Sequence, residues 1–194
     1  MLKQRILALA RKTILPVYRS MIVRGPVSMG KEVHIGPGSR VECWRGMTIG
    51  DHVYVGKYCS IVVDGSIGND VLIGNNVGLV GRHDHDHRAV GVGIRRAPWI
   101  GDADYDGPGL TERLVVEDDV WIGFGSVVLS GVIVGRGSIV AAGSVVINDV
   151  PRYSIVGGSP AKVISQRFDE REIIEHERLL YGSAQRVEPD QPTD

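Results

Sequence analysis

Residues 116–146 read VEDDVWIGFGSVVLSGVIVGRGSIVAAGSVV, and an aliphatic side chain returns in them at every sixth position. The same spacing runs through residues 35–79, apart from one step of eight between Val41 and Ile49. A period of six belongs neither to an α-helix nor to one long strand, whose side chains repeat every 3.6 and 2 residues. It predicts short strands separated by sharp corners. The aliphatic positions are Ile35, Val41, Ile49, Val55, Ile61, Ile67, Ile73, Leu79, Val116, Ile122, Val128, Val134, Val140 and Val146.

The residues between these positions suit the corners of a triangular coil. Gly follows the aliphatic residue in half of the units, and Ser, Cys or Val usually stands four residues after it. Gly accepts backbone angles that are closed to other residues, and a small side chain fits the narrow space inside a corner. Since three units close one coil, the repeat predicts an all-β fold, a parallel β-helix of just under five coils.

The segments outside the repeat complete the expected organisation of the chain. Residues 1–24 contain six basic residues and no acidic one, and we expect a helix that either caps the coil or rests on an anionic membrane. Residues 25–166 form the β-helix, which a loop without periodicity interrupts at 81–113. Residues 167–182 predict a C-terminal helix that begins with a capping box of Asp169 and Glu172. Residues 183–194 are polar and predict a disordered tail.

Composition and charge narrow the classes of function. The formal net charge is −1, so no basic field indicates a nucleic-acid partner. No apolar run reaches the roughly 18 residues of a membrane span, and the N-terminus does not read as a cleavable signal, so we expect a cytoplasmic protein. The two cysteines, Cys43 and Cys59, lack metal-site or redox spacing, and Cys59 falls on an inward position.

Residues that carry chemistry gather where the repeat gives way to the long loop. His83, His85 and His87 alternate there with Asp84 and Asp86. A His that titrates near neutrality can take a proton from one group and return it to another, and loops on rigid scaffolds often hold such residues. Two other interpretations stay open: a solvated polar loop, and a metal site of the three histidines, although ligands so close in sequence strain tetrahedral geometry.

The second half of the repeat resembles the hexapeptide-repeat acetyltransferases. The resemblance rests on VWIG at 120–123, AAGS at 141–144 and GGSPAKVI at 157–164, and extends over about residues 30–167. It implies a left-handed coil, acetyl-CoA as the acetyl donor, and a homotrimer with its active site between subunits. The ending QRFD at 166–169 is similar to the xenobiotic, streptogramin-type branch. The start of the loop at His83 is equally similar to sugar and polysaccharide O-acetyltransferases.

The resemblance also implies roles for individual residues. The family's catalytic base is the first His of the loop, which matches His83, and His85 is the second candidate. Asp64 resembles a substrate-facing acid of sugar acetyltransferases, and we expect it to bind the acceptor together with Asp84. Lys162 matches a cationic position near the nucleotide phosphates. The residues expected to bind acetyl-CoA are Trp121, Gly123, Ala142, Gly143, Lys162 and Arg167.

We therefore expect an acetyl-CoA-dependent O-acetyltransferase that modifies a hydroxyl of a sugar or polysaccharide precursor, in the cytoplasm or at the inner face of the membrane. Transfer would be direct, with His as general base. The alternatives are acetylation of an antibiotic and, more remotely, a zinc-dependent hydratase similar to hexapeptide-repeat carbonic anhydrases. Ile147-Asn148-Asp149 stands where galactoside and maltose acetyltransferases carry Thr-Lys-Asp, so one cationic contact to the cofactor is missing.

Overall fold

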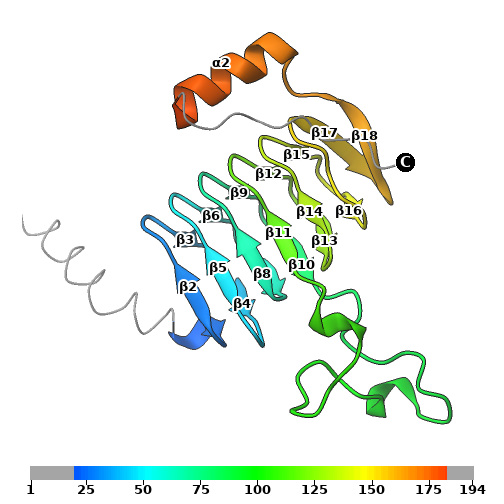
Figure 1. Ribbon diagram of the computed structural model, residues 1–194. Helices are drawn as coiled ribbons and strands as arrows, with labels where there is room; N and C mark the ends of the chain where they lie inside the picture. Colours follow the sequence, from blue (N-terminus) through cyan, green and yellow to red (C-terminus); the bar gives the residue numbers. More distant parts are fainter. Residues whose placement is uncertain (1–19, 183–194) are drawn as a thin grey trace, which may run out of the picture.

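The computed structural model describes residues 20–182, which form a left-handed parallel β-helix with three sheets as its sides (Figure 1). Sheet A contains β1 (Val23–Arg24), β4 (Arg40–Glu42), β7 (Ser60–Val62), β10 (Gly78–Val80), β13 (Val127–Leu129) and β16 (Val145–Val146). Sheet B contains β2 (Val27–Met29), β5 (Met47–Ile49), β8 (Gly65–Ile67), β11 (Leu114–Val116) and β14 (Ile133–Val134). Sheet C contains β3 (His34–Ile35), β6 (Tyr54–Val55), β9 (Leu72–Ile73), β12 (Trp121–Ile122), β15 (Ile139–Val140), β17 (Ser154–Gly158) and the antiparallel β18 (Ala161–Gln166).

The described part of the chain visits sheets A, B and C in turn and makes six coils, more than the just under five that the repeat predicts. The difference arises at the ends, where β1, β2 and β17 extend the sheets: Val23 and Met29 continue the six-residue spacing in front of Ile35, whereas Val156 of β17 lies ten residues after Val146. Val23 in β1 pairs with Val41, so residues 23–24 belong to the coil and not to the predicted N-terminal segment. Residues 1–19 and 183–194, which hold most of the predicted N-terminal helix and the whole predicted tail, lie outside the described residues.

The core confirms the predicted inward positions. All fourteen aliphatic residues of the repeat point into the prism, where Ile35 is partly buried and the other thirteen are fully buried. Cys59 and the corner serines Ser39, Ser126 and Ser144 are buried as well. Burial of one aliphatic side chain stabilises the fold by about 1.5–3 kcal/mol, so the repeat itself supplies most of the apolar burial of the coil.

Both departures from the repeat lie at the corner between sheets A and B, called here the A–B corner. The step of eight adds two residues between β4 and β5, and residues 81–113 leave the coil between β10 and β11 (Figure 1). Asp64 lies in the coil between these two. Its Oδ1 accepts hydrogen bonds from the N–H groups of Trp44, Arg45 and Gly46 at 2.9, 2.8 and 3.0 Å. One carboxylate oxygen therefore fixes the backbone of the shorter insertion.

The C-terminal helix α2 (Glu170–Tyr181) begins with the predicted capping box, which the structure confirms. Asp169 accepts hydrogen bonds from the N–H groups of Arg171 and Glu172, and the Glu172 carboxylate accepts one from the N–H of Asp169. No helix within residues 20–182 is both long and apolar enough to cross a membrane.

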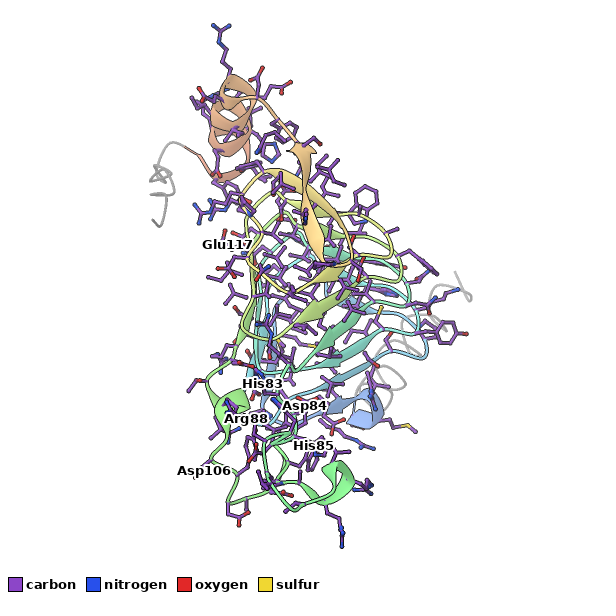
Figure 2. The ribbon with its side chains drawn as sticks, turned by 90° about the vertical axis from the view of Figure 1, so that its right-hand side faces the viewer. His83, Asp84, His85, Arg88, Asp106 and Glu117 are labelled. Carbon is purple, nitrogen blue, oxygen red and sulfur yellow. The ribbon has the colours of Figure 1, made fainter. Side chains whose placement is uncertain are left out.

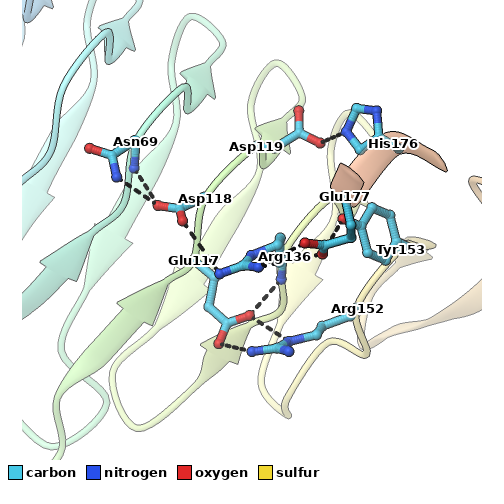
Figure 3. Close-up of polar contacts among 9 residues, drawn as sticks. All are labelled: Asn69, Glu117, Asp118, Asp119, Arg136, Arg152, Tyr153, His176 and Glu177. Carbon is cyan, nitrogen blue, oxygen red and sulfur yellow. Dashed lines mark hydrogen bonds and ion pairs between the residues drawn. The ribbon is translucent and has the colours of Figure 1, made fainter. Parts of the chain in front are cut away.

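A buried polar cluster fastens α2 to the last coils (Figure 3). Glu177 of the helix accepts a hydrogen bond of 2.6 Å from the hydroxyl of Tyr153 and one of 3.1 Å from Nη1 of Arg136. His176 lies next to it, with Nε2 at 3.0 Å from Oδ2 of Asp119. Burial, and then the bonded Glu177, raise the pKa of Tyr153 above its usual range. The phenol therefore stays protonated and keeps donating to the helix.

Candidate functional site

His83 stands at the start of the long loop, three residues after β10, and is oriented by a carboxylate. Its Nδ1 lies 2.8 Å from Oε1 of Glu112 and its side chain is partly buried. A carboxylate only accepts hydrogen bonds, so Nδ1 carries the proton and Nε2 of the neutral ring is left as an acceptor. This is the tautomer that a general base requires.

Glu112 is held in turn by the coil. Its Oε2 accepts a hydrogen bond of 3.2 Å from the hydroxyl of Ser130, and the Ser130 oxygen accepts one of 2.9 Å from the N–H of Arg82. From the other side, the hydroxyl of Tyr105 donates to the carbonyl of His83 at 3.1 Å. His83 is thus tied to both ends of the loop and to the next coil. Neither Glu112 nor Ser130 is among the residues predicted from the sequence.

The other residues of the His-Asp run have different surroundings. Asp84 folds back on Gly81, and its carboxylate occupies the place that a Cβ at position 81 would take. Burial raises the pKa of Asp84, and the neighbouring His85 opposes that rise. Oδ1 of Asp84 and Nδ1 of His85 are buried with no hydrogen-bond partner in residues 20–182. Figure 2 shows His83 next to the coil and His85 farther along the loop. The carboxylate that orients His83 has no counterpart at His85.

A small cavity of about 10 Å³ at the A–B corner brings together three predicted site residues, His83, Asp84 and Asp64. Trp44 and Glu112 also line it. Its size is comparable with a single water molecule. Asp64 is buried and one of its oxygens already holds three backbone N–H groups, so the shape of this corner depends on it.

The residues expected to bind acetyl-CoA, apart from Arg167, lie toward a different corner of the same chain. Trp121 is on β12 with 51% of its surface exposed, and Gly123 follows it. A Cβ at Gly123 would lie 2.6 Å from the backbone nitrogen of Ala142, so neighbouring coils approach closely here. Ala142 and Gly143 are exposed at the corner between sheets C and A. Sheet A separates this corner from His83, so one chain does not bring His83 and these residues together.

The two predicted cationic residues, Lys162 and Arg167, differ in whether the side chain is exposed or already hydrogen-bonded. Lys162 is exposed on β18, opposite Gly157. Arg167 donates from Nη1 to Oδ2 of Asp119 at 2.7 Å and to the carbonyl of Gly137 at 2.9 Å. The guanidinium of Arg167 therefore fastens the end of β18 to the coil, which leaves Lys162 as the free charge of the pair.

The histidines of the loop do not converge on one point. The rings of His83 and His87 are stacked, with centroids 5.6 Å apart and planes 17° from parallel. In the described ranges, no group of three or more His, Cys, Asp or Glu side chains is placed to hold a metal ion.

Known proteins share this arrangement of strands. Residues 114–148 match the family described as "Bacterial transferase hexapeptide (six repeats)". The crystal structure of the hexapeptide-repeat-containing acetyltransferase VCA0836 from Vibrio cholerae is 30% identical, with 72% of this chain and 73% of that one aligned at a TM-score of 0.53. The structure of the same protein complexed with acetyl-CoA aligns with 78% and 75% of the two chains at 28% identity, with a TM-score of 0.56.

Curated relatives include antibiotic acetyltransferases and a 2,3,4,5-tetrahydropyridine-2,6-dicarboxylate N-acetyltransferase from Brevibacillus brevis. Chloramphenicol acetyltransferase from Klebsiella aerogenes is 33% identical over 123 residues, which are 63% of this chain and 55% of that protein. A probable macrolide acetyltransferase from Lysinibacillus sphaericus is 34% identical over 132 residues, 64% of this chain and 66% of the relative. The chain thus spans between about half and two thirds of the length of these two proteins. With its six-residue repeat, its coil and its likeness to the Vibrio cholerae structure, the chain belongs to the hexapeptide-repeat acetyltransferases.

Proposed function

We propose that the protein is an acetyl-CoA-dependent O-acetyltransferase whose acceptor is a hydroxyl of a sugar or polysaccharide precursor. The observation that carries this proposal is the His83–Glu112 pair, because it leaves Nε2 of the neutral ring unprotonated, in a side chain that is partly exposed beside the coil. In this role Nε2 takes the proton of the acceptor hydroxyl while the hydroxyl oxygen attacks the thioester carbon. The C–S bond then breaks, and His83 returns the proton to the sulfur, which leaves CoA and an acetyl ester. Glu112 stabilises the imidazolium between the two steps.

Acetyl-CoA would lie along the corner between sheets C and A. Gly123, Ala142 and Gly143 leave room there for a narrow chain to approach the backbone. The exposed ammonium of Lys162 would contact a phosphate, which gains from a charge-assisted hydrogen bond.

We propose a homotrimer with a site shared between subunits, because the two corners lie at different edges of sheet A. Since His83 and the expected cofactor residues lie on opposite sides of sheet A, His83 of one protomer would face the groove of its neighbour. Support comes from the outer face of sheet C, where Tyr54, Leu72 and Trp121 stand in register on neighbouring strands with 45%, 46% and 51% of their surface exposed. Such an exposed apolar row is typical of a face that a partner covers.

Acetylation of an antibiotic is the second candidate, and the two antibiotic acetyltransferases among the curated relatives favour it. One experiment separates the candidates: CoA release from acetyl-CoA, measured with a thiol reagent, in the presence of methyl pyranosides, chloramphenicol, a macrolide, or a simple amine. We expect release with pyranosides and an acetyl ester in the product. Turnover with the antibiotics alone would move the acceptor to the second candidate, and an amide product would contradict O-acetylation.

A further inference from the structure

Two of the chain's three tryptophans meet at the A–B corner. Trp44 belongs to the two-residue insertion between β4 and β5, and Trp99 belongs to the long loop. Their ring centroids are 6.0 Å apart and their planes are perpendicular. The pair therefore forms from the two places at which the sequence departs from the six-residue repeat.

The two rings lie outside the apolar core of the coil. In residues 20–182 the buried core consists of Val, Ile, Leu, Met and Cys side chains, and neither tryptophan belongs to it. Trp44 is only half-buried, and 38% of the surface of Trp99 is exposed. Exposed apolar surface stabilises nothing until something covers it, which indicates a role in binding.

Both rings are held in place before any ligand arrives. The Trp44 backbone is fixed by the Asp64 carboxylate. The Trp99 N–H donates to Oδ2 of Asp102 at 2.9 Å, and Trp99 pairs with His85 in an antiparallel bridge. Its ring lies over Gly101, where a Cβ would come within 2.1 Å of it. A binding surface whose side chains are already ordered loses little conformational freedom when it binds a ligand.

The Trp44–Trp99 pair lies next to His83, the proposed base. Trp44 and His83 line one cavity, and His85, the bridge partner of Trp99, is two residues from His83 in the loop. The cavity itself is too small for a sugar ring, so a ring would rest on the exposed indole outside it, with one hydroxyl directed toward His83.

We propose that Trp44 and Trp99 form an acceptor subsite that binds the C–H face of a pyranose ring. The ring carbons of a pyranose carry oxygens that polarise their C–H bonds, so these hydrogens are attracted to the negative face of an indole. Its hydroxyls project from the rim, where the exposed Arg45 and Asp102 stand next to the two tryptophans. The inference rests on the proposed function, since it names the part of the acceptor that the A–B corner recognises.

Steady-state kinetics test the subsite. Trp99→Ala should lower kcat/KM for methyl pyranosides about tenfold, through a higher KM, and leave the KM for acetyl-CoA unchanged. Trp99→Phe should keep most of the activity. With sorbitol, an acceptor that has no ring, Trp99→Ala should lower kcat/KM much less than with the pyranosides. The matched control is Val90→Ala, because Val90 lies on the same loop with 99% of its surface exposed. An equal fall in kcat/KM of Trp99→Ala for sorbitol and for the pyranosides, or no fall at all, would contradict the subsite.

A binding measurement without acetyl-CoA separates this inference from the proposed reaction. Methyl pyranosides should quench the tryptophan fluorescence saturably, and the quenching should fall in Trp99→Phe and persist in Trp121→Phe. Saturable quenching without CoA release would support the subsite and contradict the proposed acetyl transfer. Acetylation of other hydroxyl acceptors, with no quenching by any pyranoside, would support the proposed acetyl transfer and contradict the subsite. Trp44→Phe, which preserves an aromatic ring at the corner, should retain both binding and melting temperature.

Discussion

Nδ1 of His83 and Oε1 of Glu112 lie 2.8 Å apart, although the two residues stand 29 positions apart at opposite ends of the loop. The contact closes the loop at its base and sets the proton on the far side of the ring from Nε2. The same hydrogen bond therefore has a structural and a chemical consequence, and the variants below separate them.

His83→Ala should lower kcat about 10²–10⁴-fold, because it removes the group that takes the hydroxyl proton. Binding of CoA, measured by calorimetry, and the oligomeric state should not change. His85→Ala is the matched control and should retain measurable activity, since no carboxylate orients its ring as Glu112 orients that of His83. If the two variants exchange their effects, His85 is the base.

Glu112→Gln should lower kcat about 10–100-fold, since a hydrogen bond to a charged group is lost in the transition state. The KM for acetyl-CoA should not change. Ser130→Ala keeps the carboxylate and should have a smaller effect. A fall in melting temperature that accounts for the whole loss of activity would show that Glu112 only closes the loop.

Lys162→Ala should raise the KM for acetyl-CoA severalfold with little change in kcat, the pattern expected when a uniform binding contact is lost. Lys31→Ala, an exposed lysine at another corner, is the control and should change neither constant. Dephospho-CoA as donor reports on the contact. If Lys162→Ala raises the KM for the dephospho donor as much as the KM for acetyl-CoA, Lys162 does not contact the ribose phosphate.

The coil could be predicted almost completely, because its signal is local. Each inward aliphatic residue recurs six positions from the last, so thirteen of the fourteen predicted positions are fully buried. The capping box of α2 is likewise a signal within four residues and is confirmed. The predicted coil lacks only its ends: Val23 and Met29 extend the period in front of Ile35, and β17 pairs with β15 although it does not keep the period.

The site could be predicted only in part, because its contacts depend on the path of a loop that has no period. The His-Asp run points to His83 by residue type. Glu112 is one acidic residue among several in the loop, and nothing in its spacing shows that it returns to His83. Arg167 illustrates the same limit: its charge is visible in the sequence, whereas its hydrogen bond to Asp119, 48 residues away, is visible only in the fold.

Stability should depend on pH through Glu117. Burial alone would raise the pKa of this carboxyl, but hydrogen bonds from Arg152 and from the backbone of Arg136 outweigh burial and lower it (Figure 3). A folded pKa below the unfolded value of about 4.3 means that the stabilisation is present above that pH and is lost as pH falls through the folded pKa. Glu117→Gln should therefore lower the melting temperature at pH 7 by about 2–4 °C, for a loss of about 1 kcal/mol.

The same variant should also flatten the fall in melting temperature between pH 5 and pH 3, measured by calorimetry across that range. Glu175→Gln is the control, since the Glu175–Arg178 pair is exposed to solvent and should contribute little. An acid profile that is unchanged by Glu117→Gln would show that other carboxylates govern the transition.

Deletion of residues 1–19 should distinguish the two roles predicted for the N-terminal segment, and it spares β1. Loss of solubility or of melting temperature, with no change in vesicle binding, identifies a cap. A stable, active protein that no longer sediments with anionic vesicles at low salt identifies a membrane helix, since each basic residue adds about 1 kcal/mol at such a surface. Full-length protein that does not bind such vesicles at all would contradict the membrane role.

Leu79 pairs with Ile61 on one side and with Val128 on the other, so the ladder of sheet A continues across residues 81–113 as though the loop were absent. The register of the coil is thus independent of the length and the content of this loop. A loop of another member of the family could be exchanged between β10 and β11 without a change in the hydrophobic core. If the loop recognises the acceptor as we propose, exchange of this one segment would change the acceptor while the coil stays the same.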